Sequence, residues 1–186
     1  QARYPLHDYQ RLARLMNQLR IVKSPFEIEI IAHACELTAG GFERLLHFVK
    51  PGVTETEIEA ELAHEFIRGG GGFAYSPIIA SGENTCVLHY IQNDQVCRKG
   101  DLVLLDVAAS YANYRSDLTR TIPVSGRFTR RQKQVYNAVL RVLRETIRLM
   151  TPGKLPKELQ KDAEKIVEEE LLGLGLLKPS EIKKQD

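Results

Sequence analysis

Two aspartates near the middle of the chain have the type and spacing of a metal-binding pair. Asp106 lies in an apolar stretch, residues 102–109, and Asp117 follows a short polar turn. If the chain reverses about Ala112, the two carboxylates fall nearly opposite each other, where Cβ atoms lie about 4.5–5.5 Å apart. Two like charges so close repel and raise one pKa, and a divalent cation between them removes the conflict. Carboxylate oxygens suit hard cations such as Mn²⁺ or Mg²⁺.

A second interpretation of the same residues needs no metal. Asp117 could pair with Arg115 or Arg120, and Asp106 could cap a turn. An ionised carboxylate among aliphatic side chains is costly unless it is paired or binds a metal, so both interpretations supply a partner. The spacing alone leaves the choice open.

A histidine precedes this pair along the chain. His89 follows a turn at residues 81–84 that could expose it at a cleft. A histidine beside apolar residues is commonly a core or surface residue without chemistry, and this alternative stays open. Cys86 lies nearby, but no acid is evident that would orient a Cys/His nucleophile pair.

The elements that must position these residues are predicted from apolar periodicity and capping residues. Residues 12–19 have leucines at helical spacing and predict a short helix or linker. Capping boxes begin further helices at Ser24, Thr54 and Thr129, and helical spacing continues to a fourth near residue 159. Residues 77–81, 102–109 and 118–124 have strand composition, and the last two are expected to form a hairpin. This order predicts an α+β fold.

Two glycine clusters lack an explanation at this level. Gly40 and Gly41 fall inside a predicted helix and suggest close packing against another backbone. Residues 69–72 are four consecutive glycines, which predict a tight or mobile loop after the second capped helix.

Composition excludes several classes of protein. The chain has 186 residues, 43% hydrophobic and 27% charged, with a formal net charge of +2. These values are ordinary for a globular protein and do not indicate nucleic-acid binding. No apolar run is long enough to cross a membrane, and no signal peptide is evident. The three widely spaced cysteines fit a reducing compartment, so we expect a cytoplasmic protein.

Four linked motifs run through this part of the chain: Ile79-Ala80-Ser81-Gly82-Glu83-Asn84, Leu88-His89-Tyr90, Gly100-Asp101-Leu102-Val103-Leu104-Leu105-Asp106 and Ser116-Asp117-Leu118-Thr119-Arg120-Thr121. Together they resemble the pita-bread metallopeptidases, aminopeptidase P (Xaa-Pro aminopeptidase) above all. The resemblance implies the N-terminal half of a pita-bread (creatinase/aminopeptidase) fold, an antiparallel sheet covered by helices. It further implies a linker or leading helix from a missing N-terminal domain at residues 1–22 and the first half of the catalytic domain at residues 23–186.

The same resemblance implies a role for each site residue. Asp106 resembles a ligand that chelates one metal, and Asp117 resembles a ligand that bridges two. His89 resembles the residue that positions substrate and stabilises charge in the transition state, and Tyr75 matches a tyrosine of the substrate pocket. The implied reaction is hydrolysis of an N-terminal Xaa-Pro bond by a metal-bridging hydroxide. Two divalent metal ions are implied, Mn²⁺ being usual and Zn²⁺ or Co²⁺ alternatives.

One departure from the family pattern affects activity. The family uses two Asp, one His and two Glu, and the last three are expected beyond Asp186. We therefore expect residues 1–186 to be inactive alone, with peptides carrying proline at the second position as substrates of the parent enzyme. A prolidase-type dipeptidase, a methionine aminopeptidase, a creatinase-like enzyme and a non-catalytic peptide- or protein-binding relative remain alternatives. Homo-oligomerisation stays open.

Overall fold

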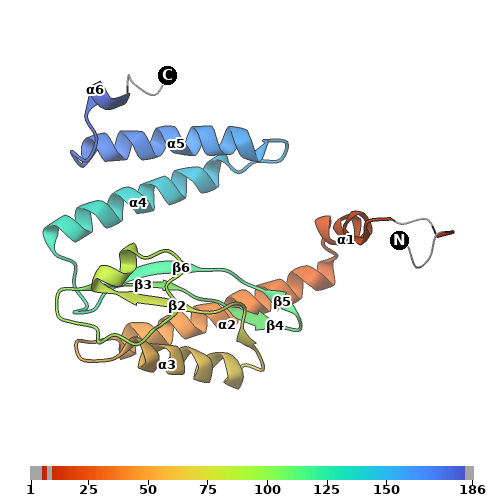
Figure 1. Ribbon diagram of the computed structural model, residues 1–186, viewed down its shortest axis with the longest axis horizontal. Coiled ribbons are helices and arrows are strands. Elements are labelled where there is room, and N and C mark those ends of the chain that lie inside the picture. The colour runs from red at the N-terminus through yellow and green to blue at the C-terminus, as the bar shows by residue number, and fades with distance from the viewer. Residues whose placement is uncertain (1–5, 8–9, 183–186) are drawn as a thin grey trace. The chain divides into compact units, whose positions relative to one another are not determined.

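The computed structural model describes residues 6–7 and 10–182, and it divides the chain into two compact units (Figure 1). The first unit spans Gln1–Gly126 and the second spans Arg127–Asp186. The predicted linker of residues 1–22 contains helix α1, Leu12–Ile21, none of whose side chains is buried. Among the described residues, no helix is both long enough and apolar enough to cross a membrane.

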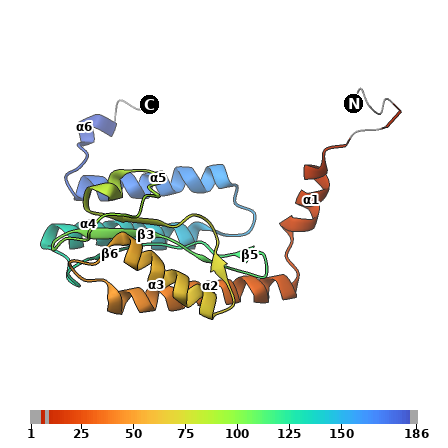
Figure 2. The same ribbon diagram turned by 60° about the horizontal axis from the view of Figure 1, so that its bottom comes forward.

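The first unit holds two three-stranded antiparallel sheets and two long helices. One sheet has the order β2-β3-β6, with β2 at Ile78–Ser81, β3 at Leu102–Asp106 and β6 at Thr119–Pro123. The other has the order β1-β4-β5, with β1 at Gly72–Phe73, β4 at Ala109–Tyr111 and β5 at Tyr114–Arg115. Helices α2, Pro25–Phe48, and α3, Glu55–Arg68, lie side by side and pack on these strands (Figures 1 and 2). A short 3₁₀ helix, η1 at Gly82–Cys86, follows β2.

The core lies between the helices and the strands. In β3, Val103 and Leu105 are fully buried, whereas Leu104 and Asp106 on the other face are half-buried. The strand is central in its sheet, as its apolar composition predicts, but it is fully buried on one face only. The core cluster consists of Phe42, Leu45, Val53, Ile58, Leu62, Phe66, Ile79, Cys97, Val103, Leu105, Val107, Ala109 and Val124.

The predicted hairpin is present, although it is built from more strands than expected. β3 pairs with β6 and β4 pairs with β5, so the predicted strand 102–109 is two strands separated by Val107 and Ala108. The reversal occurs at Ala112 and Asn113, whose φ angles are +46° and +68°. Two consecutive residues with positive φ suit the two-residue turn that matches the twist of paired strands.

Both long helices of this unit begin with the predicted capping boxes. Ser24 accepts from the Glu27 backbone N–H, and Thr54 accepts from the Glu57 backbone N–H. Each glutamate in turn accepts from the backbone N–H of the cap, at 2.7 Å in both helices. These bonds satisfy N–H groups that the first helical turn leaves unpaired.

Close packing of α2 on α3 accounts for the glycine inside α2. A Cβ at Gly41 would lie 2.8 Å from the Phe66 ring and 3.0 Å from Leu62. The sequence suggested close packing against another backbone, but the close neighbours are side chains of α3. Gly40 has only ordinary contacts. Part of the α2 surface stays open to solvent, since Leu46 is 63% exposed.

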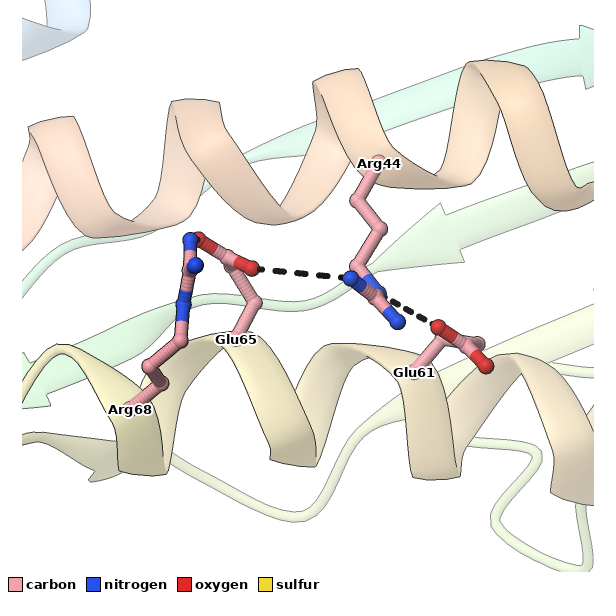
Figure 3. A network of polar contacts seen from close by, with 4 residues as sticks. All are labelled: Arg44, Glu61, Glu65 and Arg68. Atoms are coloured by element: carbon pink, nitrogen blue, oxygen red, sulfur yellow. Dashed lines mark hydrogen bonds and ion pairs between the residues drawn. The ribbon is translucent and has the colours of Figure 1, made fainter.

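An ion-pair network links the outer surfaces of α2 and α3 (Figure 3). Arg44 of α2 contacts both Glu61 and Glu65 of α3, and Arg68 also contacts Glu65 at 2.6 Å. Arg44 and Arg68 are 38% and 66% exposed, so solvent screens these charges and each pair contributes at most about 1 kcal/mol. The network aligns two helices that are held mainly by their apolar faces.

The four consecutive glycines form the end of α3 and the entry into β1. Gly70 has a φ of +78°, and the Gly71 N–H donates to the Phe66 carbonyl at 2.9 Å, which is the left-handed helix ending that glycine favours. A Cβ at Gly69 would collide with Leu37, and one at Gly71 would lie 2.5 Å from the Ser110 carbonyl oxygen. Gly72 has open space. The segment is therefore a tight turn against a neighbouring strand.

Replacing Gly71 with alanine is expected to destabilise the protein. The added methyl group would overlap a backbone oxygen that cannot move without disturbing β4, and such overpacking costs about 1–3 kcal/mol. Gly72→Ala, in open space, is the matched control and should leave the unfolding midpoint nearly unchanged. Urea unfolding of both variants measures the difference. Equal midpoints for the two variants would show that the turn is not tight.

The second unit is a helical hairpin with a short terminal helix. It contains α4, Arg130–Leu149, α5, Pro156–Gly173, and α6, Pro179–Ile182. The predicted cap at Thr129 is present and accepts from the Gln132 backbone N–H at 3.3 Å. Helix α6 follows directly after Lys178.

Candidate metal centre

Tyr75 joins the two aspartates through one hydroxyl group. Its O–H donates to Asp106 Oδ1 at 2.7 Å and to Asp117 Oδ1 at 3.2 Å. Both carboxylates therefore lie around a single phenol oxygen, although Asp106 ends β3 and Asp117 lies in the segment between β5 and β6. Burial and the hydrogen bond to Asp106 raise the pKa of Tyr75, so the phenol stays a proton donor at neutral pH.

The two aspartates were expected to lie nearly opposite each other, but they are two positions apart in register. Asp106 pairs with Thr119 in the β3–β6 ladder, and the β4–β5 ladder keeps the same register. Asp117 thus lies two residues from the position opposite Asp106, on the same side of the hairpin. A turn centred on Ala112 would place Leu118 opposite Asp106, whereas the turn is centred between Ala112 and Asn113 and so adds one further position of offset. Diagonal neighbours of this kind remain within reach of longer side chains.

The alternative of arginine partners is contradicted within the described residues. No ion pair there involves Asp106 or Asp117, and the Arg120 guanidinium donates to the Thr119 carbonyl instead. Asp106 ends β3 and does not cap a turn. Two neighbouring carboxylates without a cationic side chain form the electrostatic environment that a bound cation stabilises.

Burial of the pair differs from the sequence prediction. Asp106 is half-buried and Asp117 is exposed, so the aspartates are not sunk among aliphatic side chains. The reason is that Asp106 projects from the less buried face of β3, opposite to Val103 and Leu105. An accessible carboxylate pair can receive a cation or a ligand from solvent.

The donor set fits part of a metal centre. Two carboxylates supply oxygens of the kind that Mn²⁺ prefers, and beyond the bonds from Tyr75 their other oxygens have no hydrogen bond among the described residues. No group of three or more His, Cys, Asp or Glu that could hold a metal occurs in the described part of the chain. Two octahedral ions would need on the order of ten donor positions. The pair could thus form one side of such a centre.

Helix α2 holds both strands of the hairpin beside the aspartates. The buried Thr38 hydroxyl accepts from the Ala109 backbone N–H at 2.8 Å and lies 2.6 Å from the Ser116 hydroxyl. Ser116 directly precedes Asp117, and its hydroxyl also donates to the Ala109 carbonyl at 2.9 Å. These hydrogen bonds between Thr38, Ala109 and Ser116 form a clamp, which fixes the backbone shortly after Asp106 and directly before Asp117. The sequence contained no signal for it, because both hydroxyl residues are common in helices and turns.

Replacing Thr38 with valine is expected to destabilise the protein by about 1–3 kcal/mol. Valine keeps the shape of threonine but leaves the buried Ala109 N–H without an acceptor, and an unsatisfied buried donor costs that amount. Thr151→Val, at an exposed position after α4, controls for loss of a threonine hydroxyl. Thermal unfolding compares the two variants. A Thr38→Val midpoint equal to that of the control would show that the clamp contributes no stability.

His89 lies outside the group formed by Tyr75 and the aspartates. Its side chain is exposed and makes no hydrogen bond or ion pair with any residue that the structure describes. Its backbone has a φ of +54°, the left-handed region that costs a non-glycine residue about 1–2 kcal/mol. The structure therefore places three of the four predicted site residues together and leaves the histidine on a neighbouring exposed segment.

Comparison with known proteins identifies the family of this chain. A family model described as "Metallopeptidase family M24" matches residues 29–183. The chain belongs to metallopeptidase family M24. Among curated M24 relatives, the Xaa-Pro aminopeptidase of Escherichia coli K12 is 40% identical over 165 residues, 88% of this chain and 37% of that protein. Human Xaa-Pro aminopeptidase 3 is 36% identical, over 89% of this chain and 33% of that protein.

Solved structures of similar proteins confirm the fold. A structure of a putative aminopeptidase P from Bacillus anthracis gives a TM-score of 0.92 at 36% identity, covering 97% of this chain and 43% of that one. E. coli aminopeptidase P in complex with substrate gives 0.88 at 39% identity, covering 92% and 40%. The predicted pita-bread fold is thus confirmed for this chain. The chain spans about two fifths of the length of the proteins it matches.

Proposed function

We propose that the intact protein is a metal-dependent aminopeptidase that hydrolyses the bond between an N-terminal residue and a following proline. The observation that carries this proposal is the pair of carboxylates around the Tyr75 hydroxyl, in a chain of family M24. Relatives named Xaa-Pro aminopeptidase support the choice of substrate class. We further propose that residues 23–186 are the first half of the catalytic domain and residues 1–22 a leading segment.

In this proposal Asp106 and Asp117 hold two divalent cations from one side. The cations would supply a hydrolytic water at neutral pH and polarise the scissile carbonyl. We expect Mn²⁺, with Zn²⁺ or Co²⁺ as alternatives; a zinc-substituted E. coli aminopeptidase P has been solved in complex with product. Helix α2 holds the backbone at Ala109, three residues after Asp106, and at Ser116, directly before Asp117.

Tyr75 and His89 would act on the peptide itself. The Tyr75 hydroxyl is held between the aspartates, so it lies where the reacting end of a substrate must arrive. The His89 side chain is exposed and makes no hydrogen bond or ion pair with a residue that the structure describes. Its imidazole can therefore contact a peptide and donate a hydrogen bond to charge that develops in the transition state. We propose a cytoplasmic location, consistent with three free cysteines at 35, 86 and 97.

Peptide hydrolysis by the purified intact protein tests the proposal. With Mn²⁺ present, we expect release of free alanine from Ala-Pro-Ala but not from Ala-Ala-Ala, because the proposed specificity is for proline at the second position. Equal release from both peptides would contradict that specificity, and no release from either would favour a non-catalytic relative. Hydrolysis of the dipeptide Ala-Pro alone would favour a prolidase-type enzyme.

Residues 1–186 alone are expected to hydrolyse none of these peptides. The described residues offer two carboxylates at the site, far fewer donors than a two-metal centre requires. The same assay, at equal concentrations of residues 1–186 and of the intact protein, measures this. Turnover by residues 1–186 would show that the missing ligands are not needed.

A further inference from the structure

One fully buried carboxylate holds the chain on both sides of His89. Glu55, the first residue of α3, is 0% exposed. Its Oε1 accepts from the Ser81 backbone N–H at 2.6 Å and from the Ser81 hydroxyl at 2.7 Å. Its Oε2 accepts from the Tyr90 hydroxyl at 2.8 Å and from the Gln95 backbone N–H at 3.0 Å. Four donors match the acceptor capacity of an ionised carboxylate, which offsets the cost of burying it.

The segment between these donors needs such an anchor. Val87, Leu88 and Ile91 are 54%, 91% and 59% exposed, so these three side chains do not hold the backbone around His89 by packing. His89 nevertheless has a φ of +54°, and a residue keeps such a conformation only where its surroundings impose it. Tyr90 is the next residue, is buried, and is bonded to Glu55.

A second anchor holds the far side of the segment without reaching His89. The buried Asn93 side chain accepts from the Ile79 backbone N–H at 3.0 Å and donates to the Pro77 carbonyl and to Glu59. These bonds fix the segment to β2, four residues beyond His89. The constraint directly beside the histidine is therefore the bond between Tyr90 and Glu55.

We propose that Glu55 is a positioning residue that fixes the left-handed turn at His89 through the Tyr90 hydroxyl. The proposal rests on the proposed aminopeptidase function, in which the His89 imidazole contacts the substrate. Glu55 itself touches no reacting group. Its effect on the reaction is to keep the imidazole at one place relative to the carboxylate pair, on a segment that is otherwise exposed.

Glu55→Gln tests the positioning role of Glu55 sharply, because glutamine has the same shape as glutamate but only one acceptor oxygen. Each carboxylate oxygen accepts a backbone N–H, one from Ser81 and one from Gln95. In either orientation, the amide NH₂ group therefore faces one of these N–H groups, and that bond is lost. Tyr90→Phe is milder, since it removes only the Tyr90 hydroxyl, which bonds Glu55 at 2.8 Å and Asp94 Oδ1 at 3.3 Å.

The experiment compares Glu55→Gln, Tyr90→Phe and the double variant in the intact protein. Glu57→Gln is the matched control, because this glutamate is exposed in the same helical turn and glutamine preserves its capping role. We expect both single variants to lower kcat for an Ala-Pro peptide by about tenfold or more with little change in KM, since misplacing a catalytic group by about 1 Å costs on that scale. Hydrogen exchange of residues 82–96 should be faster in both, but not in the control.

Coupling between the two variants separates positioning from general stability. If Glu55 acts through Tyr90, the double variant loses no more kcat than the more severe single variant. Multiplied losses, or a Glu55→Gln protein with a lower thermal midpoint but unchanged kcat, would overturn the inference and leave the proposed function intact. An inactive wild-type protein would overturn the proposed function and the role of His89 with it. If Glu55→Gln fails to fold, unchanged kcat in Tyr90→Phe is sufficient to overturn the inference.

Discussion

Replacing Asp117 with asparagine in the intact protein is expected to lower kcat/KM for an Xaa-Pro peptide on the order of 10³-fold. The amide oxygen can still accept the hydrogen bond from Tyr75, so the hairpin should keep its shape. The amide is neutral and cannot bridge two cations, so the charge that stabilises the metal centre is lost. Asp106→Asn should have a similar effect, because both carboxylates meet the same hydroxyl.

The control for this prediction is an aspartate distant from the site in sequence and role. Asp162 of α5 pairs with Lys154 at 2.7 Å and with Lys165 at 3.4 Å, on the surface of the second unit. Asp162→Asn should leave kcat/KM within about twofold, since surface ion pairs contribute little. Metal content after dialysis gives an independent readout. An Asp117→Asn protein with wild-type kcat/KM and metal content would contradict the assigned role.

Replacing His89 with alanine is expected to lower kcat/KM for the same peptide by about 10²-fold or more. A donor aimed at charge that forms only in the transition state contributes on that scale, and its loss falls mainly on kcat. The His89 side chain makes no hydrogen bond or ion pair with a described residue, so the substitution should not lower the free energy of unfolding. Alanine removes only the imidazole, and the bond between Tyr90 and Glu55 still holds the backbone turn.

His64→Ala is the matched control, because His64 is an exposed histidine on α3. It should match the wild type in kcat, KM and thermal midpoint. Steady-state kinetics with an Ala-Pro peptide compare the two histidine variants directly. Near-normal kcat/KM for His89→Ala would mean that the exposed imidazole has no part in the reaction.

Much of the architecture follows from local signals in the sequence. The capping residues Ser24, Thr54 and Thr129 begin helices as predicted, because each satisfies backbone N–H groups with its own side chain. The strand composition of residues 77–81 and 118–124 also locates β2 and β6 to within one residue at each end. These features depend on a few neighbouring residues, which is why a single sequence contains them.

The register and burial of the site residues depend on contacts between residues that are distant in the sequence. A turn centred half a residue away from the predicted centre moves the residue opposite Asp106 from Leu118 to Thr119, two positions from Asp117. The burial of Glu55 could not be foreseen, because a glutamate in the first turn of a helix is ordinarily exposed and favoured there by the helix dipole. Its four donors come from segments 26 to 40 residues away. No local pattern encodes such a group.

A crystal structure of the intact protein grown with Mn²⁺, with anomalous scattering data, tests the central claim most directly. The claim is that a cation binds between the carboxylates that now share the Tyr75 hydroxyl. We predict an anomalous peak within coordination distance of oxygens from both Asp106 and Asp117. Density that shows both carboxylates still bonded to Tyr75, with manganese bound elsewhere or nowhere, would contradict the account.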